Sequence, residues 1–214
     1  MCIRDRPLGS PTHGWLARLQ PAGQVLDLNA SWQGPWPGAA GYRAQGRVEG
    51  LALNGEDSGQ MSSYGPYPLP GRPGVRNASA DFAFDEEGGQ ARVQVQDGAL
   101  ELPGVFEERL LPLRRLQTEA RWTVQGERIE VQLDRLSLAN ADAEGTGQAR
   151  WHTSDPATSS ARSRFPGVLD LTATLTRADA TRVHRYLPLH LGEPVRRYLR
   201  EACLLYTSDA ADER

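Results

Sequence analysis

The feature that most constrains this chain is a stretch, residues 115–151, in which apolar and polar residues alternate. The apolar positions are Ala120, Trp122, Val124, Ile129, Val131, Leu133, Leu136 and Leu138. A period of two places every second side chain on one face of a strand, so the pattern predicts antiparallel strands with one apolar face. Between them, Gly126-Glu127 suits a type II′ hairpin turn, whose first position favours glycine. What covers the apolar face of this sheet is therefore the functional question.

The two ends of the chain share a property of DNA. The N-terminal MCIRDR and the CLLYTS that begins at Cys203 are translations of one short DNA sequence and of its reverse complement. They resemble the transposon end used in sequencing-library preparation. We therefore expect residues 1–6 and 203–214 to be sequencing artefacts and residues 7–202 to be the native fragment. Both cysteines, Cys2 and Cys203, lie in these ends, which argues against disulfide, zinc and thiol chemistry in the fragment.

Composition narrows the class of protein. The 214 residues suffice for one domain of ordinary size. Net charge is −3 and all 24 basic residues are arginine, scattered along the chain, which argues against a nucleic-acid-binding protein and is typical of a GC-rich bacterial genome. The 22 glycines and 15 prolines favour an all-β chain with many turns.

Further strands and their connections follow from the same alternation. We predict strands at 25–32, 42–53, 80–84, 91–95, 100–102 and 168–175. In the first, Leu26, Leu28, Ala30 and Trp32 are predicted to share a face, and a change of phase near Gly50 predicts a bulge or a short break in the second. Residues 54–74 and 152–166 read as loops, 106–113 as a proline-interrupted connection, and 14–19 as the end of a helix.

The C-terminal part changes to a helical pattern. Residues 183–187 fit a short helix stopped by Pro188, and Pro194 can occupy the first turn of a second helix. One face of that helix carries Val195, Tyr198, Leu199 and Ala202, and the other carries Arg196, Arg197 and Arg200. We expect it to cap the sheet in preference to lying on a membrane surface.

Residues with chemistry are present but form no recognised catalytic pattern. The chain has no nucleotide-binding glycine motif, HExxH or GxSxG, and its four histidines are far apart in sequence. The acidic run 85–87 is more typical of a solvated turn than of a calcium site. We expect no catalytic, cofactor or metal site, and no enzyme activity. Trp32, Trp122 and Trp151 suit either a platform for sugar or lipid, or large side chains covering a sheet.

Four blocks together resemble a known family. Residues 73–89, 100–122, 136–151 and 166–188 are similar, in the same order, to the central domain of YhdP-like proteins in the AsmA-like (TamB-like) group. The resemblance implies a mainly β fold, an extended, curved antiparallel sheet forming an open groove, with short helices near the C-terminal end. It also implies a piece of a longer periplasmic protein, anchored in the inner membrane of Gram-negative bacteria by a segment outside this fragment. Such proteins are associated with phospholipid movement towards the outer membrane and with the outer-membrane permeability barrier.

Two functions remain open from the sequence. The first is a groove segment that conducts or shields phospholipid acyl chains, which apolar area alone can hold at about 0.8 kcal/mol per buried methylene. The alternative is a self-contained secreted β-sandwich that binds carbohydrate or protein partners. A sandwich would cover Phe82, Val93, Trp122 and Val131 with a second sheet, and a groove would leave them on an open concave face. The groove candidates are Leu26, Leu28, Trp32, Phe82, Phe84, Val93, Val95, Trp122, Val124, Ile129, Val131, Leu133, Leu169 and Leu171.

Overall fold

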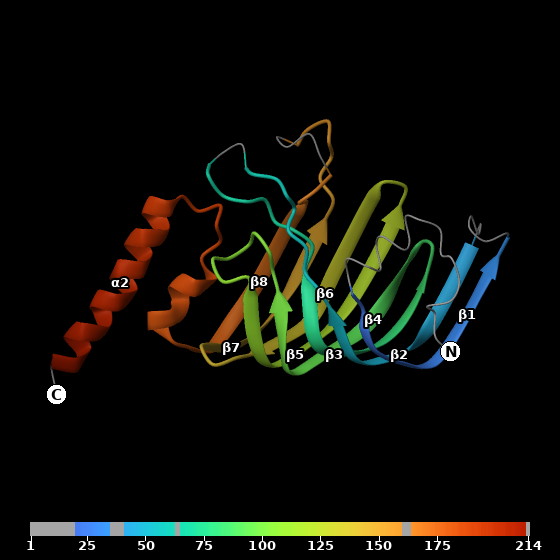
Figure 1. The fold of residues 1–214 in the computed structure, drawn as a ribbon, viewed down its shortest axis with the longest axis horizontal. Coiled ribbons are helices and arrows are strands. Elements are labelled where there is room, and N and C mark those ends of the chain that lie inside the picture. The colour runs from blue at the N-terminus through green and yellow to red at the C-terminus, as the bar shows by residue number, and fades with distance from the viewer. Residues whose placement is uncertain (1–19, 35–40, 63–64, 160–163, 213–214) are drawn as a thin grey trace.

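The chain folds into a single eight-stranded antiparallel sheet in which every strand pairs with the next one in sequence (Figure 1). The computed structural model describes residues 20–34, 41–62, 65–159 and 164–212. The strands are β1 (Ala22–Gln33), β2 (Gly41–Leu53), β3 (Gly74–Asp85), β4 (Gly88–Glu101), β5 (Leu110–Gln125), β6 (Arg128–Ala139), β7 (Ala143–His152) and β8 (Val168–Ala178). The sheet is not closed, so the predicted mainly β, open architecture is confirmed.

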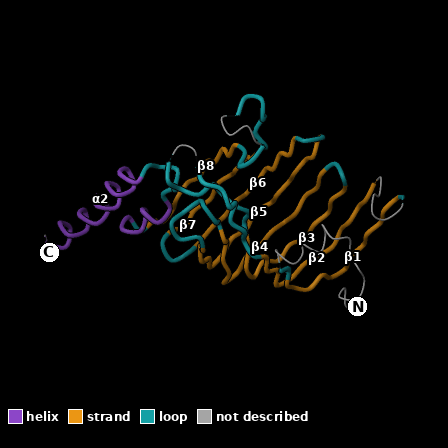
Figure 2. The backbone as a smooth tube through the Cα atoms, turned by 45° about the horizontal axis from the view of Figure 1, so that its top comes forward, coloured by secondary structure: helices purple, strands orange, loops and turns teal. Residues whose placement is uncertain are grey.

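A line of left-handed residues bends the strands. Positive φ angles occur at Asp27 (51°), Gly50 (61°), Asn77 (58°), Asp97 (45°) and Arg135 (50°), each on a different strand. Such a residue interrupts the alternation of faces and bends the strand, and the pairing register shifts beside all five of these residues. The bulge predicted near Gly50 is therefore confirmed. Because the bends lie on neighbouring strands, the sheet folds along this line, which we call the crease, into a trough (Figures 1 and 2).

The crease divides the trough into two arms. The hairpin arm ends in the turns 86–87 and 126–127 and in the loop 153–167, and the loop arm ends in the connections 54–73, 102–109 and 140–142. The turn between β5 and β6 consists of Gly126 and Glu127, with φ of 59° at Gly126, as predicted for a type II′ hairpin. The loops predicted at 54–74 and 152–166 are also confirmed to within one or two residues.

The hydrophobic core lies at the crease. Ala78, Val95, Leu113 and Leu116 form a buried cluster with 0–7% of each residue exposed. Half-buried side chains pack around it from five strands, namely Leu51, Val75, Leu100, Leu111, Leu136 and Leu138. The trough is therefore held in its bent shape by contacts between its own strands.

Two predictions about the middle of the chain were wrong. Residues 110–113 belong to β5 rather than to a connection, and Pro112 pairs with Ala99 of β4. β6 pairs with β5 only as far as Arg115, so β5 is locally an edge strand at Pro112. The N–H that proline lacks therefore removes no hydrogen bond between strands. The separate strand expected at 100–102 is the end of β4, which continues through the bend at Asp97. The helix expected at 14–19 lies outside the described residues.

Two helices follow the sheet beside the loop arm. They are η2 (Ala180–Tyr186) and α2 (Glu193–Asp212). The expectation that α2 caps the sheet with its apolar face was wrong: α2 packs against η2, and Val195 and Tyr198 are 50% and 70% exposed. Its half-buried Arg196 and Arg200 instead pair with Glu107. This one distant acidic residue thus fixes the face of α2 that carries Arg196 and Arg200 against the β4–β5 connection.

Candidate binding groove

The inner face of the trough consists of apolar rows that run across the strands. Strand pairing aligns one residue from each of the eight strands in a row that we call the aromatic row, namely Ala30, Ala44, Phe84, Gly89, Trp122, Val131, Trp151 and Leu169. The next row towards the crease, the alanine row, contains Gly46, Phe82, Ala91, Ala120, Leu133, Ala149 and Leu171. Directly paired residues share a face, so both rows line the same side of the sheet.

The aromatic side chains of the hairpin arm contact one another. Phe84 lies 5.7 Å from Phe82, 6.3 Å from Tyr42 and 6.5 Å from Trp122, measured between ring centroids. A Cβ at Gly89 would lie 2.6 Å from Cζ2 of Trp122 and 2.5 Å from Cβ of Phe84. Glycine at this position therefore makes room for the indole between two strands.

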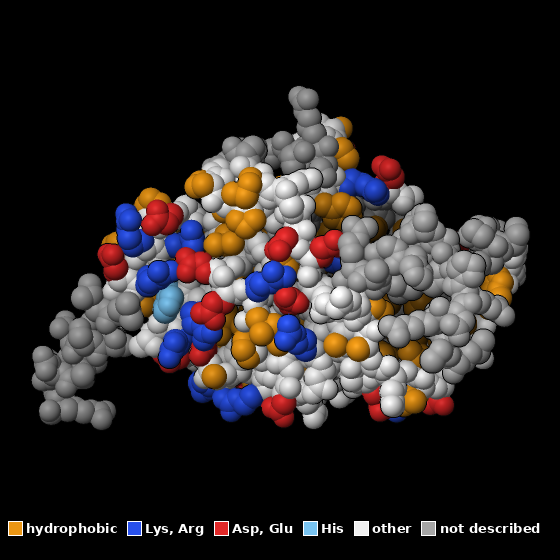
Figure 3. All heavy atoms as spheres, viewed as in Figure 1, with side chains coloured by type: hydrophobic (Ala, Val, Ile, Leu, Met, Phe, Trp, Pro, Cys, Tyr) orange, Lys and Arg blue, Asp and Glu red, His pale blue; other side chains and the backbone are white. Residues whose placement is uncertain are grey.

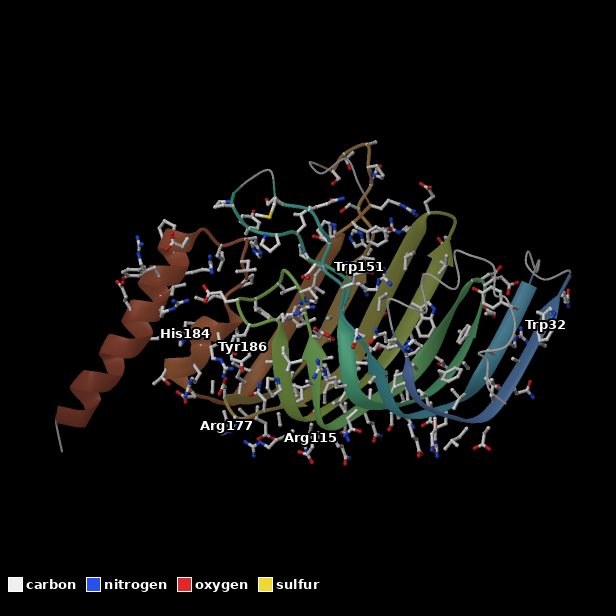
Figure 4. The ribbon with its side chains drawn as sticks, viewed as in Figure 1. Trp32, Arg115, Trp151, Arg177, His184 and Tyr186 are labelled. Carbon is white, nitrogen blue, oxygen red and sulfur yellow. The ribbon has the colours of Figure 1, made fainter. Side chains whose placement is uncertain are left out.

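Trp151 is fixed by the loop that precedes β8. Its Nε1 donates a hydrogen bond of 2.9 Å to the carbonyl of Pro166, and its ring stacks on Phe165 with 6.2 Å between centroids. Figure 4 shows Trp151 on β7 and Trp32 far away on β1. Because the indole N–H already has an acceptor, the ring adds apolar surface to the groove without a polar group that needs a partner.

The inner face is open at both ends of the sheet. Large side chains are 56–60% exposed on β1 and 58–61% exposed on β8, in contrast to the buried cluster at the crease. They are Val25, Leu28 and Trp32 at one end and Leu169, Leu171 and Leu175 at the other. Both edge strands thus present apolar surface that the described part of the chain leaves uncovered.

Most of the sequence-predicted groove residues lie together on this face. Phe84, Trp122, Val131 and Leu169 are in the aromatic row, and Phe82, Leu133 and Leu171 are in the alanine row. The other candidates on this face lie outside the two rows. Val93 pairs with Ala80, Val124 pairs with Ile129, and Trp32 pairs with Tyr42. Val95 is at the crease, and Leu28 alternates with Ala30.

Leu26 is the exception among these candidates. The bulge at Asp27 shifts the register, so that Leu26 pairs with Arg47 on the outer face and Val25 pairs with Val48 on the inner one. The prediction of a single face for Leu26, Leu28, Ala30 and Trp32 was therefore wrong for Leu26. Sequence reasoning also missed Leu116, although its alternation with Ala120 and Trp122 was a usable signal.

The outer face carries charged side chains that pair across the strands. Arg47 bonds to Asp81 at 2.7 Å, and Glu119 accepts from Arg135 at 2.9 Å and from Arg92 at 3.4 Å. Hydrogen bonds from Gln132 and then from Arg121 hold the pKa of the Asp134 carboxyl below its ordinary value. Arg115 and Arg177 lie along the lower edge of the trough in Figure 4. This face is solvated and mixed in charge, which contrasts with the uncharged inner rows.

A buried polar cluster joins η2 to the loop arm. The Asp142 carboxylate, in a residue 8% exposed, accepts hydrogen bonds from Arg185 at 2.6 Å and from the Tyr186 hydroxyl at 2.9 Å. Asn140 donates to the same hydroxyl at 2.9 Å and accepts from two backbone N–H groups. Burial, and then the bond to Asp142, raise the pKa of the Tyr186 phenol. These bonds connect η2 to residues 140–142 of the loop arm, so the cluster suits an anchor.

The β4–β5 connection is held by side chains of η2 and α2. Arg185 bonds to Glu108 and holds the pKa of that carboxyl below its ordinary value, while Arg196 and Arg200 both bond to Glu107. The amide of Leu189 donates to the carbonyl of Val105 at 2.9 Å. Figure 3 shows the resulting interleaved basic and acidic side chains around η2 and α2.

Other chemistry considered from the sequence can be placed in the structure. The Asp85 carboxylate accepts from the amides of Glu87 and Gly88, and Glu86 accepts from the amide of Tyr42, so these side chains close the turn and its neighbour. Among the described residues, no three His, Cys, Asp or Glu side chains are grouped as metal ligands would be. No helix in the described ranges has the length and apolar character needed to cross a membrane.

Comparison with known proteins gives one match, which covers nearly the whole chain. The model of the family described as YhdP protein matches residues 7–212. No curated protein and no solved structure matches the chain. The family match spans the strands, the crease and the helices described above, and the chain therefore belongs to the YhdP protein family.

Proposed function

We propose that this chain is a segment of a periplasmic groove that conducts or shields phospholipid between the inner and outer membranes of a Gram-negative cell, and so supports the outer-membrane permeability barrier. Family membership supports the coarser statement of an envelope protein connected with lipid transport. In this proposal an anchor outside the fragment attaches the protein to the inner membrane. The groove works by binding alone, without enzyme chemistry.

The observation that carries the proposal is the open apolar face. A soluble monomer rarely leaves a large contiguous apolar surface exposed, yet Leu169, Leu171 and Leu175 are 58–61% exposed at one edge of this sheet. Each methylene that an acyl chain buries against such a surface contributes about 0.8 kcal/mol. A groove can therefore hold lipid tails by area, with no need for a polar recognition site.

The sandwich alternative is not favoured by the fold. A sandwich requires a second sheet packed about 10 Å from the first, and the described residues form one sheet whose strands all pair in order. Phe82, Val93, Trp122 and Val131 lie on the face of that sheet that also carries the buried cluster at the crease, which supports the groove over the sandwich.

Photo-crosslinking in cells tests the proposal, because strand alternation offers a matched control. p-Benzoylphenylalanine is introduced at Leu133 on the inner face, or at the adjacent Gln132 on the outer face, of the complete protein that contains this segment. After irradiation, adducts are identified by mass spectrometry. We expect phospholipid adducts at Leu133 and none at Gln132. Equal labelling at the two positions, or no lipid at either, would contradict the proposal.

A further inference from the structure

The crease and the hairpin arm of the trough differ in the space that they leave for a ligand. At the crease, Ala78, Val95, Leu113 and Leu116 are buried by one another, with exposed fractions of 2%, 0%, 3% and 7%. Leu136 and Leu138 pack against the same cluster. The bottom of the trough is therefore already filled along its central strands, and an acyl chain placed there would have to displace the core.

The hairpin arm has a different surface. Small side chains occupy the alanine row on β4, β5 and β7, at Ala91, Ala120 and Ala149, and lie between the larger Phe82, Leu133 and Leu171 of the same row. Phe84, Trp122 and Trp151 project from the adjacent aromatic row. Since tryptophan extends much farther from the sheet than alanine, the two rows form a step at β5, where Trp122 lies beside Ala120, and at β7, where Trp151 lies beside Ala149.

We infer that an acyl chain lies across the strands in the alanine row, with one side against Phe84, Trp122 and Trp151, and not in the crease. This inference rests on the proposed function and assigns the position of the ligand within the groove. The chain contacts the aromatic rings along its length, which makes the aromatic row the wall that separates it from the rim of the hairpin arm.

The charge and hydrogen-bonding character of the two rows selects an acyl chain over a polypeptide. None of their side chains ionises, and the charged residues of the same strands alternate onto the outer face, as Arg92 and Arg121 do. A polypeptide laid across the rows would bury backbone N–H and C=O groups without partners, at about 1–3 kcal/mol for each group. A hydrocarbon chain has no such groups, so only the hydrocarbon complements this surface without penalty.

The length of the alanine row also suits this ligand. It extends from Gly46 on β2 to Leu171 on β8. Six strand spacings of about 4.8 Å give roughly 29 Å, whereas the acyl chains of one leaflet span about 15 Å of a bilayer. The row is therefore longer than one acyl chain, and Leu171 at its β8 end is 58% exposed.

Two crosslinking positions in the complete protein distinguish the row from the crease. p-Benzoylphenylalanine at Leu133 reports on the alanine row, and at Leu138 it reports on the crease, since Leu138 pairs with Leu116. We expect phospholipid adducts several-fold stronger at Leu133 than at Leu138. Equal or stronger lipid labelling at Leu138 would overturn the inference while leaving the proposed function intact. Polypeptide adducts at Leu133 would overturn it in favour of a protein segment, and the absence of lipid at both positions would instead count against the proposed function.

A blocking substitution gives an independent test. Ala120 pairs directly with Leu133, so Ala120→Trp fills the row beside the crosslinker, whereas Arg121→Trp adds the same bulk to the outer face. Lipid labelling at Leu133 is expected to fall several-fold with Ala120→Trp and to stay unchanged with Arg121→Trp. Circular dichroism of both variants checks that they are folded. Ala91→Phe, on the neighbouring strand, repeats the test if Ala120→Trp does not fold, and undiminished labelling in a folded row variant would refute the placement.

Discussion

Truncating one leucine at the crease and one on the open face should have very different costs. Leu116 is 7% exposed and packs in the cluster with Ala78, Val95 and Leu113. Leu171 is 58% exposed at the β8 edge of the alanine row. The same change, leucine to alanine, therefore compares a filled site with an open one on the same face of the same sheet.

The expected magnitudes follow from burial. Leu116→Ala removes a buried side chain and leaves a cavity, which costs about 3 kcal/mol within the usual range of roughly 2–5 kcal/mol. Leu171→Ala loses only the buried fraction of a side chain whose full burial stabilises by about 1.5–3 kcal/mol, and it leaves no cavity, so its cost is about 1 kcal/mol or less. For a chain of this size, about 3 kcal/mol corresponds to a loss of roughly 6–12 °C in Tm.

Urea unfolding of the 214-residue chain, followed by circular dichroism, measures both variants. The free energy of unfolding should fall for Leu116→Ala by at least about twice as much as for Leu171→Ala, with unchanged dependence on urea concentration. If the two substitutions cost the same, Leu171 is covered in solution. The inner face would then be closed, and the reasoning that leads to a groove would fail.

Three further predictions concern the anchor, the pH dependence and the crease. Asp142→Ala should lower the free energy of unfolding by about 2–3 kcal/mol, because Arg185 and Tyr186 lose the charged group that accepts their hydrogen bonds. A loss below about 1 kcal/mol, measured by urea unfolding, would argue against the anchor. Since the folded-state pKa of Glu108 is lowered, its stabilising contribution should be complete above the ordinary carboxyl pKa of about 4.3 and disappear as the pH falls through the lowered value. Glu108→Gln should therefore show a weaker acid dependence of Tm than the unmodified chain, and identical acid profiles would contradict this. Gly50→Ala should cost about 1–2 kcal/mol through its φ of 61° alone, since no atom lies within 4 Å of an added Cβ, and Gly50→Asn should cost less.

The sequence was sufficient to predict most of the strands and which of their faces is apolar, although it misplaced residues 100–102 and 110–113. Alternation is a local property of each strand, so Trp122, Val131 and Leu169 were assigned to the same face before their pairing was known. The turn at Gly126-Glu127 and the bulge at Gly50 were also predictable, because the conformations they require favour glycine. The predicted groove residues follow from this local pattern, with the exception of Leu26.

The bent shape of the sheet depended on tertiary structure. Asp27, Asn77, Asp97 and Arg135 can all adopt ordinary strand geometry, so nothing in the sequence marked them as left-handed or placed them beside one another. Only pairing in register brings these bends into one line, and that line separates a filled crease from an open hairpin arm. Leu26 was misassigned for this reason, because a single left-handed residue at Asp27 reverses the phase of its strand.

The sequence by itself therefore determined the strands, their turns and the apolar character of one face, because these depend on neighbouring residues and a period of two. The tertiary structure decided where the face is filled and where it is open, and it decided the orientation of α2. That helix is held by Glu107, which is 89 residues from Arg196 and 93 from Arg200 along the chain. Interactions between such distant residues leave no periodic signal, and they exist only once the sheet has folded.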